Sequence, residues 1–146
     1  MCKKTIFYGR GSKVVDLKNP NLLSVGDTIT FKGTLYKDEA QTIVIGISQN
    51  TWTITDTSDY SKIVYLSVRQ LTITEKNGLL GIGDILVSSY GVVDNLTVTN
   101  NVLSPIYTTA ESMITGGTGK YLGIFGTMVN VSNGGKASLI FKFKKN

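Results

Sequence analysis

The residues best suited to chemistry stand at alternate positions of one stretch, residues 63–71. Tyr65, Ser67 and Arg69 are each two residues apart, so in a β-strand their side chains point to the same face. A phenol, a hydroxyl and a guanidinium can all donate hydrogen bonds to a carbonyl oxygen on which negative charge develops. We therefore predict that Tyr65, Ser67 and Arg69 are catalytic residues.

The other ionisable residues exclude most familiar reaction types. The chain has no histidine, which removes the commonest general base near neutral pH and the commonest metal ligand. Most carboxylates stand in expected turns, where they cap or solvate the backbone rather than form a catalytic pair. Asp84 and Glu111 stand in expected strands, where an outward position or a pair with a lysine is the expected role. We therefore expect no metal and no other cofactor.

A glycine-rich run at residues 116–126 contains five glycines in eleven residues. Such a run can aim backbone N–H groups at a phosphate, but a phosphate-binding loop leads into a helix. Here residues 128–131 follow, with the alternation of a β-strand. A tight turn between two long strands is the better interpretation.

The composition indicates one domain. A chain of 146 residues with 41% apolar and 17% charged residues is long enough for one full core. No linker or repeat divides it, and the one clear break is Pro20 between two asparagines. We therefore divide the chain into an N-terminal strand and lead-in, residues 1–24, and a β-barrel domain, residues 25–146.

Period-two alternation dominates the chain, and no long stretch has the periodicity of a helix. Polar turn residues separate the alternating segments. The predicted strands are residues 5–8, 28–36, 42–55, 62–74, 79–90, 96–99, 106–115, 121–131 and 137–144. Regular hairpins without helices predict an all-β fold, either an up-and-down barrel or a sandwich.

Several short motifs together resemble one family of small barrels. They are the glycine-rich run, Gly26-Asp27, Phe31, Leu35-Tyr36-Lys37-Asp38, Ile45-Gly46 and the final strand at residues 139–143. In this order they resemble allene oxide cyclases and dirigent proteins, and in pattern most closely the bacterial spirotetronate cyclases. The resemblance covers about residues 25–143. It implies a single small antiparallel up-and-down β-barrel of about eight strands.

The family's own catalytic residues do not carry over. The acid and the arginine of dirigent proteins fall at Lys120 and Phe125, and the pocket tyrosine and tryptophan of the spirotetronate cyclases fall near Ser67 and Asn130. The resemblance therefore implies the scaffold and not a particular substrate.

The family's register, combined with alternation, predicts which side chains line the interior. The predicted substrate-binding residues are Phe31, Asn50, Trp52, Leu71 and Met128. They mix apolar walls with hydrogen-bonding groups, as in small-molecule pockets. A solid core also needs aromatic and β-branched residues at alternate positions, so Trp52 fits either a pocket wall or an ordinary core.

The register itself has an alternative. A shift of one residue would place Val64, Leu66 and Val68 in the core and turn Tyr65 and Arg69 to solvent or to a subunit interface. If Arg69 faces inward, its guanidinium requires a carboxylate, backbone carbonyls, or a ligand with an anionic group or a carbonyl.

The charge balance is basic, with a formal net charge of +5. Lys142, Lys144 and Lys145 cluster near the C-terminus, and alternation with phenylalanine predicts an outer strand face kept soluble by lysine rather than a nucleic-acid site. The single cysteine, Cys2, allows no internal disulfide. Without an apolar leader or a membrane-spanning stretch, we expect a cytoplasmic protein that binds neither membrane nor nucleic acid.

The expected function follows from the scaffold. The resemblance implies a cofactor-independent cyclase or isomerase that binds a largely apolar natural-product precursor inside the barrel and directs a stereoselective ring closure, such as a [4+2] cyclisation. The alternative is a noncatalytic ligand-binding barrel or a structural barrel. In either case the family implies a homo-oligomer, a dimer or a trimer.

Overall fold

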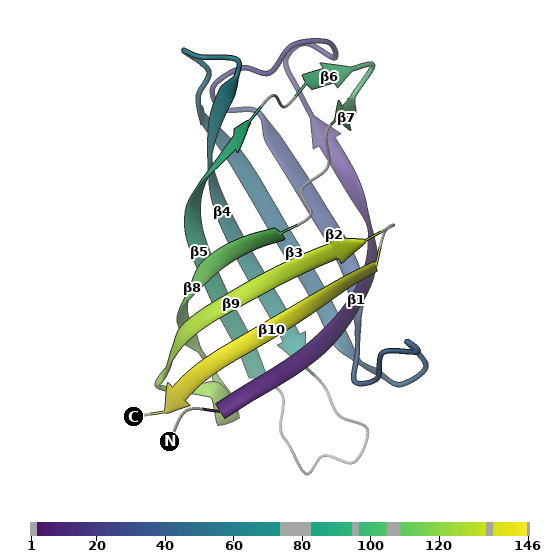
Figure 1. The fold of residues 1–146 in the computed structure, drawn as a ribbon, viewed down its shortest axis with the longest axis vertical. Coiled ribbons are helices and arrows are strands. Elements are labelled where there is room, and N and C mark those ends of the chain that lie inside the picture. The colour runs from purple at the N-terminus through teal and green to yellow at the C-terminus, as the bar shows by residue number, and fades with distance from the viewer. Residues whose placement is uncertain (1–2, 74–82, 95–96, 105–108, 134–135, 146) are drawn as a thin grey trace.

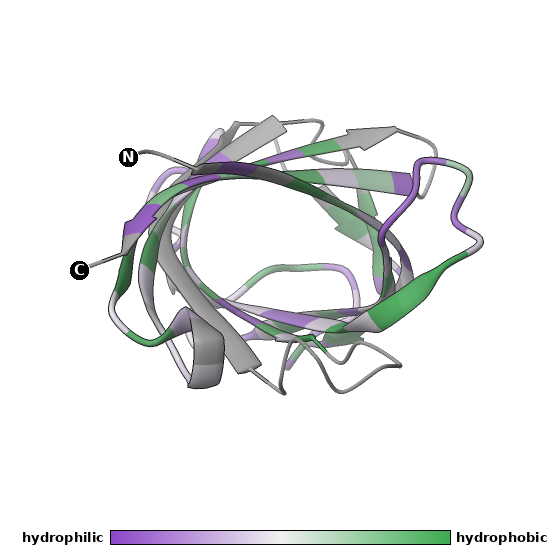
Figure 2. Ribbon diagram, turned by 90° about the horizontal axis from the view of Figure 1, so that it is seen from below, coloured by the Kyte–Doolittle hydropathy of each residue, from purple (hydrophilic) through white to green (hydrophobic). Residues whose placement is uncertain are grey.

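The protein is a closed antiparallel barrel of eight strands in the order β1-β10-β9-β8-β5-β4-β3-β2. This computed structural model describes residues 3–73, 83–94, 97–104, 109–133 and 136–145. The barrel strands are β1 (Lys3–Asp16), β2 (Thr28–Tyr36), β3 (Val44–Asp56), β4 (Lys62–Ile73), β5 (Gly83–Asp94), β8 (Thr109–Gly117), β9 (Ile124–Asn133) and β10 (Lys136–Lys145). Figure 2 looks along the barrel and shows the strands closing into a ring. The predicted up-and-down barrel is confirmed.

The first strand is longer than alternation predicted. Strand β1 pairs with β10 from Lys3 to Arg10 and with β2 from Tyr8 to Asp16. The prediction of a short strand at residues 5–8, set apart from the barrel, is therefore wrong, because β1 is the strand that closes the ring. Glycines and charged residues interrupt its hydrophobic alternation, so the sequence pattern showed only part of it.

A small hairpin interrupts the sequence of barrel strands between β5 and β8. Its strands are β6 (Thr97–Thr99) and β7 (Val102–Ser104), joined by Asn100 and Asn101. These two residues have φ angles of 49° and 61°, as a type I′ turn requires. The sequence predicted β6 but missed β7. Figure 1 places this hairpin at the end of the barrel opposite the chain termini.

The glycine-rich run forms the predicted turn between two long strands. Strand β8 ends at Gly117, a single helical turn η1 (Gly119–Tyr121) follows, and β9 begins at Ile124. Just before β9, Gly123 has a φ of 75°, a backbone conformation that glycine adopts without steric cost. The glycines of this run therefore permit the backbone conformations of the turn between β8 and β9.

The described residues of the barrel interior form two apolar clusters. The cluster that we call the glycine-loop end comprises Leu35, Ile45, Leu71, Ile73, Ile114, Tyr121, Ile124, Met128, Leu139 and Phe141, with Phe7 and Phe143 packed against it. The cluster that we call the aromatic end comprises Leu23, Ile29, Trp52, Ile54, Ile63, Tyr65, Val98 and Leu103, with Val15, Leu17 and Phe31 packed against it. The β6–β7 hairpin contributes Val98 and Leu103, so it covers the aromatic end.

The burial of the β4 side chains shows which of the two predicted registers is correct. Its inward face reads Ile63, Tyr65, Ser67, Arg69, Leu71 and Ile73, all buried. The residues of the alternative register, Val64, Leu66 and Val68, face outward, and Val68 is 47% exposed. The register shifted by one residue is therefore wrong.

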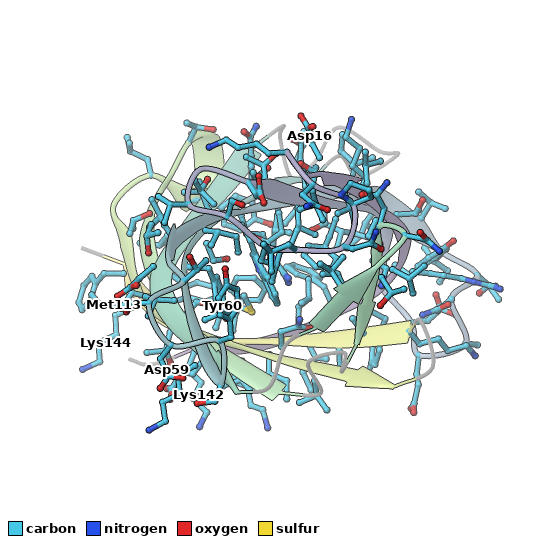
Figure 3. All side chains as sticks on the ribbon, turned by 90° about the horizontal axis from the view of Figure 1, so that it is seen from above. Asp16, Asp59, Tyr60, Met113, Lys142 and Lys144 are labelled. Atoms are coloured by element: carbon cyan, nitrogen blue, oxygen red, sulfur yellow. The ribbon has the colours of Figure 1, made fainter. Side chains whose placement is uncertain are left out.

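The outer surface carries the predicted lysines. Lys142 and Lys144 are exposed on β10, while Phe141 of the same strand is fully buried in the barrel interior. Figure 3 shows both lysines pointing away from the barrel. Among the residues described, no helix is long and apolar enough to cross a membrane.

Candidate functional site

A layer of polar side chains crosses the barrel between the two apolar clusters. Its described members are Asn50, Ser67, Arg69 and Ser112, all buried, and we call it the polar belt. On β4, Ser67 and Arg69 stand between Tyr65 of the aromatic end and Leu71 of the glycine-loop end. Alternation thus places the belt inside the barrel, where polar groups are expected only with hydrogen-bond partners.

One hydrogen bond joins two of these strands within the belt. The Ser67 hydroxyl donates to Asn50 Oδ1 over 2.9 Å, and both residues are buried. In the β3–β4 ladder Asn50 lies opposite Arg69, and Ser67 lies opposite Trp52. The bond therefore runs diagonally across the ladder and fixes the Ser67 hydroxyl beside the guanidinium-bearing position.

Arg69 is the least satisfied of the belt residues. Its side chain is 9% exposed, and its Nε is buried with no hydrogen-bond partner. Burial lowers the Arg69 pKa to about 10, an effect that Tyr65 partly opposes. The guanidinium therefore stays cationic at neutral pH. Leaving one buried donor unpaired costs about 1–3 kcal/mol.

An aromatic stack adjoins the belt on the side of the aromatic end. The Trp52 and Tyr65 rings stack with centroids 4.2 Å apart and planes 22° apart. Phe31 packs on Trp52 at 5.0 Å with a tilt of 58°. Three strands thus supply one continuous aromatic wall, which we call the aromatic stack.

The structure brings six of the eight predicted site residues together in the belt and the stack. These six are Phe31, Asn50, Trp52, Tyr65, Ser67 and Arg69. The other two, Leu71 and Met128, are buried in the glycine-loop end. Their placement inside the barrel agrees with the sequence analysis, whereas their roles in catalysis and substrate binding stay predictions.

The sequence did not predict the burial of two polar residues, Ser112 and Asp27. Ser112 belongs to the belt, and the signal for it was its position two residues before the inward Ile114 on β8. Asp27 is 2% exposed, and its carboxylate accepts the backbone N–H groups of Lys18 and Ser24 at 3.0 and 2.7 Å. Asp27 therefore stabilises the connection between β1 and β2, because both carboxylate oxygens accept hydrogen bonds from the backbone of that connection.

The other described candidate for charge chemistry, Glu111, lies outside this site. Glu111 is exposed on β8, as expected of an outward position, and the side chains of Asp84 and Lys120 lie outside the described residues. In the part of the chain that the structure describes, no cluster of acidic or cysteine side chains could hold a metal ion.

The outer wall over β3 and β4 carries a shallow groove of about 250 Å³. Its lining residues are Ile47, Gln49, Thr51, Val68, Gln70 and Thr72, none of them charged. Ile47 is 60% exposed and Val68 is 47% exposed. This surface faces away from the belt and is separate from it.

Comparison with known proteins finds likeness in structure and not in sequence. No protein-family model matches the chain, and no curated protein matches it. The pterocarpan synthase dirigent protein GePTS1 is similar over 100% of this chain and 89% of its own, with a TM-score of 0.64 and 15% identity. Pyocyanin demethylase is similar over 96% and 99%, with a TM-score of 0.63 and 17% identity.

A Diels-Alderase shares the same architecture. AbmU from Streptomyces koyangensis is similar over 99% of this chain and 69% of its own, with a TM-score of 0.62 and 15% identity. Identities this low establish a shared fold. The resemblance to cyclase and dirigent-like barrels, predicted from the sequence, is therefore confirmed at the level of the barrel.

Proposed function

We propose that this barrel binds a small, largely apolar molecule in its interior and directs a stereoselective ring closure as a cofactor-independent cyclase or isomerase. A [4+2] cyclisation is one such reaction. The similar solved structures, which include a Diels-Alderase and a dirigent protein, support this class of function.

The observation that carries the proposal is the polar belt beside the aromatic stack. A barrel that served only as a scaffold would be more stable with apolar side chains at these positions, because buried polar and charged groups cost free energy unless fully paired. Here a guanidinium with an unpartnered Nε lies between two apolar clusters. A ligand with an apolar body and one polar group would satisfy this arrangement.

The mechanism requires no general base. The stack of Phe31, Trp52 and Tyr65 would hold an extended apolar chain in a folded conformer, and holding reacting ends together can contribute about 7–11 kcal/mol to a ring closure. Arg69 and Ser67 would donate hydrogen bonds to a carbonyl of the substrate, which lowers the barrier when negative charge develops on that oxygen.

Native mass spectrometry of the protein purified from its own host tests the proposal. We expect the wild-type protein to carry a small molecule that is lost on denaturation. Trp52→Ala removes the centre of the stack, so this variant should fold and lose the molecule. Val68→Ala, on the outer wall, is the matched control and should retain it. A folded Trp52→Ala variant that keeps both the molecule and its conversion would contradict the assignment.

The outer groove favours a second candidate function, assembly into a homo-oligomer. An uncharged wall with exposed Ile47 and Val68 suits a contact between barrels. If assembly is the main role, Ile47→Asp should convert a dimer or trimer into a monomer, as sedimentation would detect, while Trp52→Ala should leave every measured property except stability unchanged.

A further inference from the structure

We propose that the ligand of this barrel carries an anionic oxygen, either a carboxylate or an ionised enol, and that this oxygen binds the Arg69 guanidinium within the polar belt. This inference rests on the proposed function and specifies its substrate class.

The polar belt holds a positive charge that no described side chain neutralises. Arg69 faces Asn50 on β3 and lies in register with Val87 on β5, and neither residue is acidic. The other described belt residues are neutral as well. Asn50 Oδ1 already accepts the Ser67 hydroxyl, so the described belt residues give the guanidinium no counter-charge.

The carboxylates that the structure describes lie elsewhere. Asp27, the buried one, accepts two backbone N–H groups in the connection between β1 and β2. The others lie at the surface or in turns: Asp16, Asp38, Glu39, Asp56, Asp59 and Glu111. An anion brought by the ligand would therefore be the counter-ion of Arg69.

A neutral carbonyl would satisfy this site only in part. It can accept one hydrogen bond from Arg69, but it leaves the buried charge uncompensated. A carboxylate or an enolate can accept two N–H groups of one guanidinium, and such charge-assisted bonds are about twice as strong as neutral ones. The guanidinium offers five N–H donors, and the buried Nε among them has no hydrogen-bond partner.

The surroundings of Arg69 define the rest of the ligand. The aromatic stack lies on one side of the belt, and aliphatic side chains of the glycine-loop end, such as Leu71, lie on the other. The geometry therefore suits an anionic head within or beside a conjugated apolar body.

Two pairs of probes of nearly equal shape separate charge from apolar binding. The first pair is trans-cinnamate and trans-cinnamamide, and the second is 4-hydroxycoumarin, which is an enolate at neutral pH, and coumarin. The chain supplies its own reporters, because it has one tryptophan and only two arginines, Arg10 and Arg69. In a ¹H–¹⁵N spectrum, the indole N–H of Trp52 reports occupancy, and the Nε–H of Arg69 reports contact with the anion.

We expect at least one anion to bind 10-fold or more tightly than its neutral counterpart, an order-of-magnitude figure for a charge-assisted bond. It should shift the Arg69 Nε–H and the Trp52 indole signals together. Whichever pair shows this advantage identifies the anion as a carboxylate or as an enolate. In Arg69→Leu the advantage should fall to about onefold while the neutral probe keeps its affinity, and Arg69→Lys should restore part of it.

The outcomes separate this inference from the proposed function. Equal binding of both members of each pair would overturn the anion inference and leave the small-molecule site intact. An anion advantage that persists in Arg69→Leu would also overturn it, because surface lysines would then be the binding groups. If no probe moves the Trp52 signal, both proposals fail. If Arg69→Leu does not fold, the paired affinities and the Arg69 signal of the wild-type protein decide alone.

Discussion

The two ends of the barrel interior are filled by different kinds of contact. At the glycine-loop end, near the chain termini, barrel strands pack aliphatic and aromatic side chains against one another, and Leu35, Leu71 and Phe141 have no exposed surface. At the aromatic end, the cover is the β6–β7 hairpin, which is not part of the barrel wall. The glycine-loop end is therefore filled by barrel strands and the single turn η1, whereas the aromatic end also receives side chains from a hairpin outside the barrel wall.

The added segment is attached by polar contacts that involve its turn. The backbone N–H of Asn100 donates to Asn21 Oδ1 over 2.8 Å, and that of Asn101 donates to the Pro20 carbonyl over 2.9 Å. Contacts at an exposed turn open at a lower free energy than a packed core. Packing within the barrel thus stabilises one end, while the end beside the candidate site is covered by a hairpin held in part by two polar contacts at its turn.

The largest expected difference between the ends is in stability. Phe141→Ala removes a fully buried ring from the glycine-loop end, so we expect the free energy of unfolding to fall by about 3–5 kcal/mol. Phe31→Ala removes a half-buried ring beside Trp52 and should cost less than half as much while weakening ligand binding. Urea unfolding measures both, and equal losses would mean that the two ends are packed alike.

The backbone of the glycine-loop end should be sensitive at one glycine. Gly126 has a φ of 152°, and a Cβ there would collide with the Lys142 carbonyl of β10. We expect Gly126→Ala to lower the free energy of unfolding by about 1–3 kcal/mol. Gly116→Ala is the control, because a Cβ there meets nothing within 4 Å. Thermal unfolding that shows the same loss in both variants would contradict this explanation.

The cover of the aromatic end should loosen when its attachment is removed. Asn21→Ala deletes the acceptor of the Asn100 N–H and should cost about 0.5–1.5 kcal/mol locally. We expect faster hydrogen exchange at Asn100 and stronger acrylamide quenching of Trp52, the chain's single tryptophan. Asn21→Asp keeps an acceptor oxygen and should behave as wild type. Unchanged quenching in Asn21→Ala would show that the hairpin is held by its apolar contacts alone.

The smallest expected effects are at one turn near each end. The Thr42 hydroxyl and the Ile43 backbone N–H hold the Asp38 pKa below 3.8, and the Ser61 hydroxyl and backbone N–H do the same for the Asp59 pKa. Because these pKa values are lowered by folding, the contribution of each carboxylate is present at neutral pH and is lost as pH falls through the lowered value.

The two turns are controls for each other in a carboxyl ¹³C titration. Thr42→Val should raise the Asp38 pKa and leave that of Asp59 unchanged, while Ser61→Ala should do the reverse. A rise of both pKa values in either variant would show that the turns are coupled through the barrel rather than independent.

Much of the fold was predictable, because long strands with one buried face show a clear alternation. Strand β2 was predicted at its observed bounds, and the inward face of β4 was predicted from Ile63 to Leu71. The charge of the belt was visible in the sequence too, since Arg69 interrupts an apolar face. The predicted register of this one strand therefore placed Tyr65, Ser67 and Arg69 of the candidate site.

The rest depended on contacts between segments distant in sequence. Strand β7 has three residues, too few for a pattern, although the Asn100-Asn101 pair was a signal for its turn. The hairpin's attachment to residues 20 and 21 joins positions about 80 apart in the chain and leaves no periodicity. The missing partner of Arg69 Nε likewise follows from three-dimensional packing and not from spacing.

Closure of the ring by β1 and β10 has a consequence during synthesis. Strand β1 emerges long before its partner β10, so one of its edges stays unpaired until translation of the barrel is nearly complete. Exposed strand edges recruit other chains, and lysine discourages this. Four basic residues lie on β1: Lys3, Lys4, Arg10 and Lys13. Mutual repulsion between unfinished chains would keep these edges apart on neighbouring ribosomes until each barrel closes on itself.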